Sequence, residues 1–260
     1  MSIYLPGLEP PEYNARDLQL YDLILVSISG GKDSIAAALL VREAAERCGV
    51  LHRVRLAYAD TGMEWADCPE HVIRVAERLG LPLHTVRPRV PLLERIRERF
   101  GVLSGGNGWP SMYCRYCTSF SKTKPIDKLL RELSPTGAVL QVTGERREES
   151  GHRAALPAFG RIDRLSPDGK RAVYGWRPVI DFREADVWAA ARSTGIEPHR
   201  CYSAGCSRLS CVGCILASNR DLAIQYEQQP ETIEKLIKLE QDTGFTVKPE
   251  KSIRERIKLT

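Results

Sequence analysis

The order strand, double glycine and helix near the N-terminus constrains this chain more than any other feature. Residues 23–28 read Leu-Ile-Leu-Val-Ser-Ile and predict a buried strand, Gly30 and Gly31 follow, and residues 35–48 have a helical pattern. Such a turn brings backbone N–H groups and the positive end of a helix to one point, which favours phosphate binding. Glycine permits the dihedral angles and the close ligand approach that this requires. An ordinary glycine turn is the alternative that the local sequence leaves open.

The turn, Ser29-Gly30-Gly31-Lys32-Asp33-Ser34, differs from the two best-known phosphate-binding loops. A Walker A loop needs Gly-x-x-x-x-Gly-Lys-Ser/Thr, whereas Asp33 follows Lys32 here. The dinucleotide fingerprint Gly-x-Gly-x-x-Gly is also absent. A phosphate loop at this position must therefore be of another type.

Short apolar runs alternate with helical patterns after this loop. Strands are expected at 53–58, 83–86 and 138–143, helices at 68–79, 91–100 and 125–133, an irregular stretch at 101–122, a hairpin turn at 166–170, and two more helices at 219–229 and 231–242. This order predicts an α/β fold with a parallel sheet that helices cover on both faces. Ligands of such sheets bind beyond the carboxyl ends of the strands, so the polar clusters 29–34, 60–64 and 144–150 are expected to converge on one crevice.

Composition sets the domain organisation and the partners that we expect. We predict an N-terminal tail at 1–20, a nucleotide-binding α/β domain at 21–176, and a cysteine-containing, mostly helical appendage packed on it at 177–260. The N-terminus has no signal-peptide pattern and no apolar stretch has membrane-spanning length, so we expect a cytoplasmic protein without a membrane partner.

The chain is basic, with a net charge of +5 and a pI of about 8.8, which suits a nucleotide or nucleic-acid substrate. Six arginines are concentrated between residues 146 and 171, at Arg146, Arg147, Arg153, Arg161, Arg164 and Arg171. Arginine forks match phosphate and sulfate oxygens well. These side chains predict either an anion-binding surface or a solvated basic face.

The spacing of the eight cysteines indicates a metal site rather than disulfide bonds. Two close groups stand out, Cys206-x4-Cys211-x2-Cys214 and Cys114-x2-Cys117. The expected ligands are Cys211 and Cys214 first, then Cys206 and Cys117, with Cys114 and Cys201 as substitutes. Cys48 and Cys68 fall in predicted helices and are expected to be structural thiols. Spacing alone leaves an iron–sulfur cluster and a structural zinc ion open.

Four segments, in order along residues 22–220, resemble the PAPS reductase family (phosphoadenosine phosphosulfate reductases) of the PP-loop ATP pyrophosphatase superfamily. They are the loop 29–34, the Asp-Thr-Gly segment 59–65, Thr-Gly-Glu-Arg-Arg-Glu-Glu-Ser at 143–150, and residues 177–181 with 186–188 running into Cys-Val-Gly-Cys at 211–214. Cys117-Thr118 with Lys122 and Pro125 is similar to another family segment, and residues 207–211 are similar to the DNA phosphorothioation ATP pyrophosphatase subunit.

This resemblance implies a HUP/PP-loop fold, with ATP, Mg²⁺ and an iron–sulfur cluster as cofactors, the cluster of 4Fe-4S type with zinc as the alternative. It implies nucleotide binding at Ser29, Gly30, Gly31, Asp33, Ser34, Tyr58, Asp60 and Gly144, and catalysis at Asp33, Lys32, Arg146, Arg147 and Lys122, with Arg208 as a further anion contact. Asp33 would hold Mg²⁺, and the metal ligands would be Cys117, Cys206, Cys211 and Cys214.

Two departures from the reductases favour ATP cleavage to AMP and pyrophosphate, followed by sulfur transfer. The loop keeps both glycines and Asp33, and no cysteine follows Cys214, where reductases carry a nucleophile in Glu-Cys-Gly-Leu-His. A sulfonucleotide reductase that releases sulfite is the second hypothesis, and a non-catalytic binding module is the third. The acceptor (tRNA, DNA or a small molecule), the sulfur donor (a protein or sulfide) and homo-oligomer formation are left open.

Overall fold

A computed structural model of the chain describes residues 17–102 and 106–258. These residues form two compact units. The first comprises residues up to Tyr58, Glu70–Thr85 and Ile126–Pro198, and the second comprises Ala59–Pro69, Val86–Pro125 and His199 onward.

The first unit is built on a six-stranded sheet in the order β3-β2-β1-β4-β6-β5. The strands are β1 (Leu23–Ile28), β2 (Val54–Ala59), β3 (Leu83–Val86), β4 (Gly137–Val142), β5 (Phe159–Arg161) and β6 (Arg171–Trp176). β1 pairs in parallel with β2 and β4, β4 pairs in parallel with β6, and β5 joins the edge antiparallel to β6. The α/β fold expected from the alternating pattern is confirmed.

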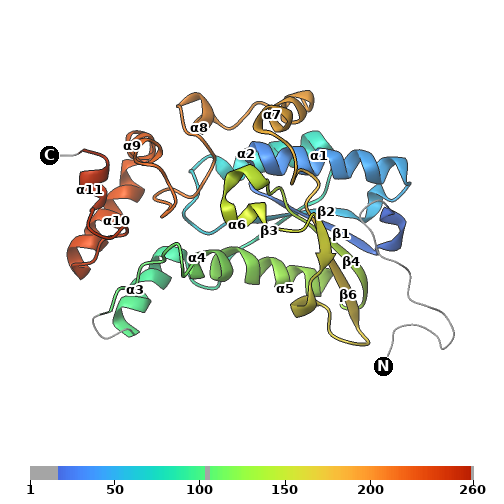
Figure 1. Cartoon of the computed structure of the whole chain (residues 1–260), viewed down its shortest axis with the longest axis horizontal. Helices are drawn as coiled ribbons and strands as arrows, with labels where there is room; N and C mark the ends of the chain where they lie inside the picture. The colour runs from blue at the N-terminus through green and yellow to red at the C-terminus, as the bar shows by residue number, and fades with distance from the viewer. Residues whose placement is uncertain (1–16, 103–105, 259–260) are drawn as a thin grey trace. The chain divides into compact units, whose positions relative to one another are not determined.

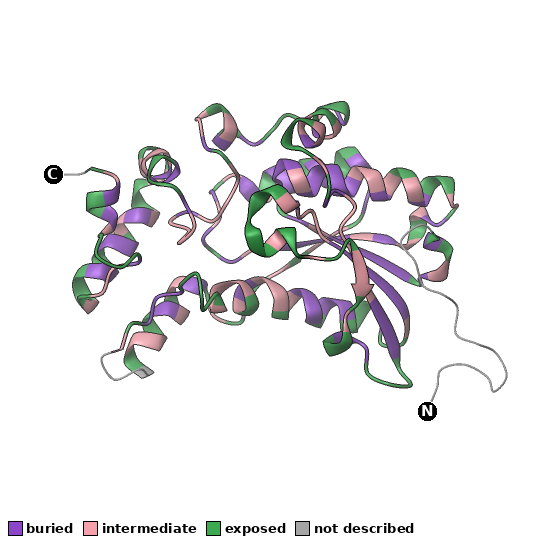
Figure 2. Ribbon diagram, in the orientation of Figure 1, coloured by how far each residue is buried: buried purple, intermediate pink, exposed green. Residues whose placement is uncertain are grey.

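Helices cover both faces of this sheet, which is why its central strands are almost entirely buried (Figure 2). Helices α1 (Lys32–Arg47) and α2 (Cys68–Leu79) lie on one face and α5 (Lys124–Leu133) lies on the other (Figure 1). Helix α7 (Glu184–Ser193) packs on α1, where Ala36 and Ala37 meet Val179 and Val187 in a common apolar cluster. Small alanines on α1 let α7 approach closely.

This packing explains why the structure does not divide near residue 176. The apolar side chains of 177–198 are buried against α1, so this stretch belongs to the sheet unit and not to a C-terminal appendage. In the other direction, residues 59–69 and 86–125 belong to the second unit although they lie between strands in the sequence. Of the predicted tail, residues 1–16 lie outside the described part, and Leu18 in a 3₁₀ turn (Leu18–Leu20) is fully buried.

The second unit contains α3 (Leu92–Val102), α4 (Tyr116–Thr118), α8 (Arg200–Ser203), α9 (Asn219–Gln228), α10 (Pro230–Thr243) and α11 (Ile253–Arg256). Helices α9, α10 and α11 contact one another, and Leu222, Ile233 and Leu236 are buried in this part. The buried carboxylate of Glu240 accepts the N–H groups of Val247 and Ile253, which fixes the segment between α10 and α11.

The stretch 101–122 is less irregular than the sequence predicts. α4 continues into a π-helical turn at Ser119–Thr123 and then into α5. The start of this helical segment is fixed because the Tyr116 hydroxyl donates to the Gly108 carbonyl at 2.7 Å and the Arg99 guanidinium lies 4.3 Å from the centre of the Tyr116 ring. π-helical turns are frequent at functional sites, and this one carries Lys122.

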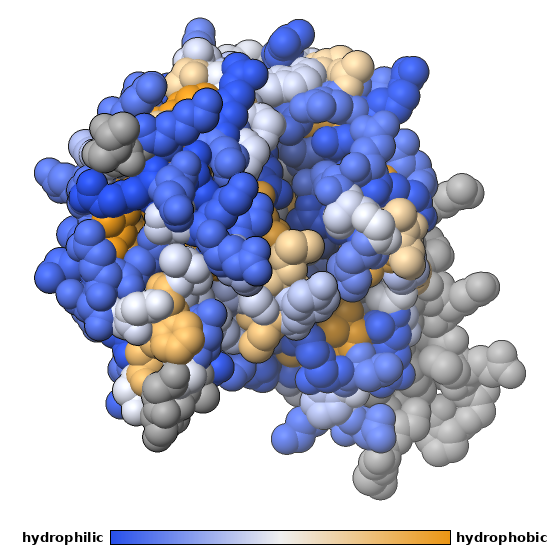
Figure 3. Space-filling view, turned by 60° about the vertical axis from the view of Figure 1, so that its left-hand side comes forward, coloured by the Kyte–Doolittle hydropathy of each residue, from blue (hydrophilic) through white to orange (hydrophobic). Residues whose placement is uncertain are grey.

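No helix in the described part of the chain is long and apolar enough to span a membrane. On the face seen in Figure 3, hydrophobic side chains form separate small areas among hydrophilic ones.

Candidate functional site

The β1–α1 loop has the backbone conformation that phosphate binding requires. Gly30 has φ of +76°, and Gly31 is the N-cap residue of α1 without a side-chain cap among the described residues. The Ser29 N–H donates to the Ser34 hydroxyl at 3.1 Å, and the same hydroxyl donates to the Gly31 carbonyl at 2.9 Å. These bonds close the loop into a tight bend and leave the positive end of the α1 dipole available to an anion.

His71 on α2, for which no role was predicted, holds this bend in place. Its Nε2 lies 3.0 Å from the Gly30 carbonyl, and since a carbonyl can only accept, Nε2 carries the proton. A Cβ atom on Gly30 would lie 2.9 Å from His71 Cδ2, too close for any residue but glycine. His71 is buried and has no metal-spaced partner in the sequence, so no local pattern marks it.

The segment after β4 meets the start of α1, as the sequence predicted for two of its three polar clusters. A Cβ atom on Gly144 would lie 2.5 Å from the Asp33 carbonyl oxygen and 2.8 Å from Ser34 Cα. Two residues further on, Arg146 Nε donates to Asp33 Oδ1 at 2.5 Å. Tyr58 pairs with Ile28 at the end of β1, next to the loop. The third cluster, 60–64, belongs to the second unit.

Charged side chains surround Asp33 at the first turn of α1. Lys32 is buried, with its Nζ 3.4 Å from Asp33 Oδ2 and 3.4 Å from Glu184 Oε1. Burial acts against the charge of Arg146, but Asp33 and Glu148 outweigh it and raise the Arg146 pKa. Two cationic side chains therefore lie beside an uncapped helix N-terminus, which is the electrostatic arrangement that polyphosphate binding needs.

Two further carboxylates belong to this site: Glu184, which the sequence did not mark, and Glu148, a neighbour of Arg146 in the sequence. Glu184, the first residue of α7, pairs with Lys32, and Glu148 accepts both Arg146 Nη1 at 2.6 Å and the Glu184 N–H at 3.2 Å. The start of α7 thus positions both cations. The Lys32–Glu184 pair depends on the packing of α7 on α1, so sequence spacing could not reveal it, whereas Glu148 lies only two residues from Arg146.

The remaining arginines of the 146–171 group are engaged within the fold. Arg147 donates to Asp181 and to the carbonyls of Ala154 and Leu156. Arg153, Arg161 and Arg164 pair with acidic side chains, and Arg171 is buried on the carbonyls of 134, 135 and 165. Apart from Arg146 this group forms neither a continuous anion-binding surface nor an unpaired solvated face, because internal partners take up its charges.

A second polar cluster, in the second unit, contains Lys122 and Cys211. Glu64 accepts the Thr61 N–H at 2.8 Å, the Cys211 thiol at 3.6 Å, and lies 3.9 Å from Lys122 Nζ. The Thr-x-x-Glu spacing of Thr61 and Glu64 is a capping-box signature and could have marked Glu64. Burial raises the Cys211 pKa to about 11, against the effect of Lys122. The proximity of Cys211 and of the Glu64 carboxylate raises the pKa of Lys122.

The predicted metal ligands separate into two groups in the second unit. Cys117 and Cys214 interact electrostatically, and Cys214 also interacts with Cys211. Cys206 instead lies near Asp221 and interacts with Cys201, whose carbonyl accepts its N–H at 2.9 Å.

Cys117, Cys211 and Cys214 carry soft thiol donors of the kind that iron and zinc prefer, and Cys206 lies apart from them beside Cys201 and Asp221. Within residues 17–102 and 106–258, no three His, Cys, Asp or Glu side chains are arranged to hold a metal ion.

Two more predicted residues lie in the second unit. Asp60 pairs with Arg87 at 2.8 Å and accepts the Gly62 N–H, and Arg208 donates to the Leu216 carbonyl. Their proposed contacts with a nucleotide stay predictions. Of the two cysteines expected to be structural thiols, Cys68 is buried, as predicted, whereas Cys48 is only half-buried.

Comparison with known proteins identifies the family of this site. The profile of the phosphoadenosine phosphosulfate reductase domain matches residues 23–217, which include the β1–α1 loop, Arg146 and Cys211 to Cys214. The chain belongs to the PAPS reductase family. The resemblance found in the four sequence segments is thereby confirmed.

Individual relatives agree with this family. The chain is 28% identical to an uncharacterised 37.8 kDa protein of Escherichia phage 186, over 83% of this chain and 74% of that protein. It is 25% identical to an adenosine 5′-phosphosulfate reductase of Burkholderia cepacia, over 80% of this chain and 79% of the reductase. A second uncharacterised relative, from Methanocaldococcus jannaschii, is 26% identical, and the match spans only 48% of its length.

Solved structures share the fold. The PAPS reductase of Candida auris, solved with phosphate, has a TM-score of 0.50 at 18% identity and covers 76% of this chain and 85% of its own. The FMN adenylyltransferase of Candida glabrata, solved with FAD and pyrophosphate, has a TM-score of 0.53 at 15% identity and covers 79% and 61%. At these identities the likeness supports the PAPS reductase family's fold for this chain and does not choose between activities.

Proposed function

We propose that this PAPS reductase family protein binds ATP on the β1–α1 loop and cleaves it between the α and β phosphates. An acceptor oxygen attacks the α-phosphorus, the bond to the bridging oxygen breaks, and pyrophosphate leaves. The AMP-activated acceptor then reacts with a sulfur nucleophile, which displaces AMP. The observation that carries this proposal is the complete phosphate loop, with Gly30 at positive φ, an uncapped α1 and Asp33 between two cations.

Each residue of the loop has a role that its chemistry supports. The backbone of Gly30, Gly31 and the first turn of α1 would hold the β and γ phosphates. Asp33 offers the hard oxygen ligand that Mg²⁺ prefers. Arg146, which is nearly buried and held by two carboxylates, is a preorganised donor for charge that develops on the α-phosphate. Lys32 neutralises phosphate charge through its position beside Asp33.

For the thiol cluster we propose that Cys117, Cys211 and Cys214 hold an iron–sulfur cluster, with Cys114 or Cys206 as the fourth ligand and zinc as the alternative metal. The support is the soft donor set and the electrostatic proximity of the three thiols. Such a cluster would supply sulfur or electrons. Metal analysis and an anaerobic absorption spectrum test it, and a colourless protein with one equivalent of zinc would exclude the cluster.

A sulfonucleotide reductase is the second candidate. The observation in its favour is that several relatives are adenosine 5′-phosphosulfate reductases. In this case Arg146 would bind the sulfate end of the substrate and the product would be sulfite. The shared fold cannot decide, since it also occurs in an adenylyltransferase solved with pyrophosphate.

Product analysis separates the candidates. Purified protein is incubated with Mg²⁺ and ATP, adenosine 5′-phosphosulfate or PAPS, in the presence of oligonucleotide acceptors and sulfide. AMP and pyrophosphate from ATP support the proposal, whereas sulfite from either sulfonucleotide supports the reductase, and binding without products supports a non-catalytic module. Asp33→Asn should lower ATP turnover by at least about 10-fold, because even the substitution of a residue that only hydrogen-bonds to a metal ligand typically has an effect of this size. Asp163→Asn, at a side chain that is 91% exposed, is the matched control and should have no effect.

A further inference from the structure

Residues 86–125 of the second unit carry an excess of positive charge. This segment contains six arginines and two lysines against two glutamates and no aspartate, a net charge of +6. Arg89 and Arg97 are exposed and form no ion pair in the part of the chain that the structure describes. The arginines of 146–171 pair with acidic side chains, except Arg171, which is buried on carbonyl oxygens, so the unpaired basic side chains concentrate in this other segment.

The same segment carries a fully exposed aromatic side chain, Tyr113. Ser111 and Cys114 close a tight turn, in which the Ser111 N–H donates to the Cys114 carbonyl at 3.1 Å and the Cys114 N–H donates to the Ser111 hydroxyl at 3.0 Å. At its tip the Tyr113 side chain is 100% exposed and Met112 is 70% exposed. A tyrosine side chain that is fully exposed does not stabilise the fold by packing. Its position therefore indicates that the Tyr113 ring binds a ligand.

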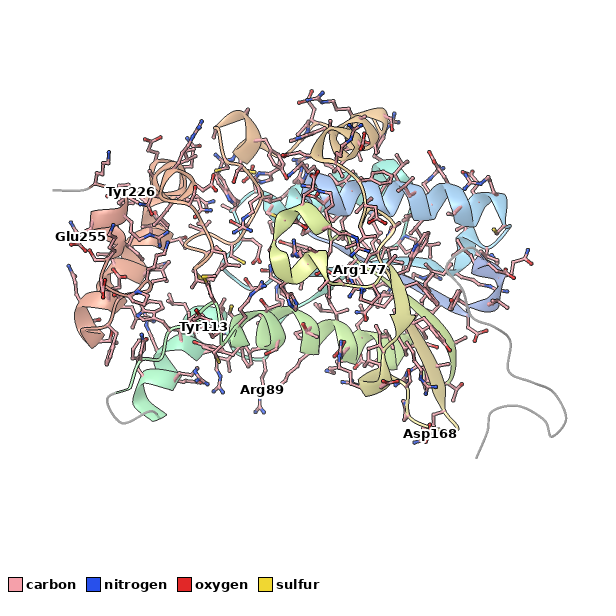
Figure 4. The ribbon with its side chains drawn as sticks, viewed as in Figure 1. Arg89, Tyr113, Asp168, Arg177, Tyr226 and Glu255 are labelled. Atoms are coloured by element: carbon pink, nitrogen blue, oxygen red, sulfur yellow. The ribbon has the colours of Figure 1, made fainter. Side chains whose placement is uncertain are left out.

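Contacts tie this turn to the basic helix α3. The rings of Phe100 and Trp109 lie edge to face with centroids 5.7 Å apart. On the other side of the turn, the Arg99 guanidinium covers the Tyr116 ring at 4.3 Å. These contacts join the segments on both sides of the Tyr113 turn to the end of α3, the helix that also carries Arg97. Figure 4 labels Tyr113 and Arg89 and shows the Arg89 side chain directed away from the ribbon.

We propose that this surface, which we call the Tyr113 surface (Tyr113 with Arg89, Arg97, Arg115 and Lys124), binds single-stranded nucleic acid. All four cationic side chains are exposed and can neutralise backbone phosphates. A fully exposed ring can stack on a base only when that base is not already stacked in a duplex. An acidic protein partner would complement the positive charge of the surface, but it would offer no nucleobase on which the exposed Tyr113 ring could stack. If the proposed ATP-dependent reaction occurs, single-stranded nucleic acid is its acceptor. Only this assignment of the acceptor rests on the proposed function.

Fluorescence anisotropy on the full chain tests this inference. The probes are a short labelled single-stranded RNA, a DNA of the same sequence and the corresponding duplex, at low salt. We expect the single strands to bind more tightly than the duplex. Tyr113→Ala should weaken binding by roughly 5- to 150-fold, the range that loss of one base–aromatic stack produces, and Tyr113→Phe should keep it. Since the ring packs on nothing, neither variant should change stability.

Charge variants supply the second readout. Arg97→Gln should lower the slope of log K against log salt concentration by about 0.7, the value for one phosphate contact of a single strand. Arg47→Gln removes an exposed charge at the end of α1 and should leave that slope unchanged. The better of the two single strands identifies the sugar that the surface prefers.

The inference is overturned if neither single strand binds at low salt, if the duplex binds as tightly, or if Tyr113→Ala binds like the unmodified protein. Each of these outcomes with ATP turnover intact would leave the proposed function standing. Loss of ATP cleavage with oligonucleotide binding intact would refute the proposed function and leave the Tyr113 surface.

Discussion

Substitution of Gly144 by alanine tests the contact on which the candidate site is built. The added Cβ would lie 2.5 Å from the Asp33 carbonyl oxygen, 2.7 Å from its carbon and 2.8 Å from Ser34 Cα. All three neighbours are backbone atoms, so no side chain can rotate away, and the end of β4 must separate from the first turn of α1. Overpacking of this kind costs about 1–3 kcal/mol. At about 2–4 °C for each kcal/mol in a chain of this size, Tm should fall by roughly 2–12 °C.

Gly151→Ala is the matched control for this substitution. Gly151 opens the short helix α6 (Gly151–Ala154), and a Cβ added there meets nothing within 4 Å. Its free energy of unfolding should change by no more than about 0.5 kcal/mol. Urea and thermal unfolding followed by circular dichroism measure both variants, and titration with ATP measures the expected loss of affinity in Gly144→Ala. Equal stability of the two variants would refute the packing of β4 against the phosphate loop.

Three further predictions follow from single residues. Gly30→Ala should destabilise the fold more than Gly49→Ala, by about 1–3 kcal/mol in urea unfolding, because both have positive φ but only Gly30 faces a close neighbour; equal losses would contradict the His71 contact. At pH 8 a thiol reagent should label exposed Cys114 well before Cys201, whose pKa burial raises to about 12; mass spectrometry that finds Cys201 labelled as early would contradict its burial. Burial acts to raise the pKa of Asp221, but hydrogen bonds from Ser207 and Ser218 outweigh it and lower this pKa. Because its pKa is lowered, ionised Asp221 stabilises the folded state above a pH of about 4. This stabilisation is lost as the pH falls through the pKa of Asp221 in the folded protein. The stability lost in Asp221→Asn, about 1.5–3 kcal/mol at neutral pH, should therefore shrink in acid, and a pH-independent difference would refute this.

The sheet could be predicted from the sequence because its signals are local. The apolar run before Gly30 gives β1, and the helix at 68–79 matches α2 because Pro69 and Gly80 mark its two ends. Residues 177–198 were misassigned because their partner is remote. Only the packing of Val187 on α1 shows that this stretch belongs to the sheet unit.

Charge pairing in the candidate site was beyond the reach of the sequence for the same reason. Asp33 and Arg146 are 113 residues apart; the strand order predicts that their loops converge, but nothing in either local pattern predicts the ion pair between the two side chains. Lys32 was expected to serve phosphate alone, yet Glu184 from α7 shares it. The conformation of Gly30, in contrast, could be predicted from the sequence, since positive φ is typical of a glycine in a tight turn between a strand and a helix, whereas Gly31 has φ of −80°.

The cysteines show where spacing misleads. Cys206, Cys211 and Cys214 are close in sequence, but a backbone hydrogen bond turns Cys206 toward Cys201 and Asp221. Cys117, nearly a hundred residues away, interacts with Cys214 instead. Local spacing identifies cysteines that are suited to bind a metal, but the fold determines which of these cysteines are neighbours.

Calorimetric titration with ATP and with AMP, each with Mg²⁺, tests the central claim most directly. If the β1–α1 loop holds the β and γ phosphates, ATP should bind at least about 10-fold more tightly than AMP, a difference of about 1.4 kcal/mol, and Asp33→Ala should abolish that preference. Equal affinities for ATP and AMP, or a preference that survives Asp33→Ala, would contradict the account.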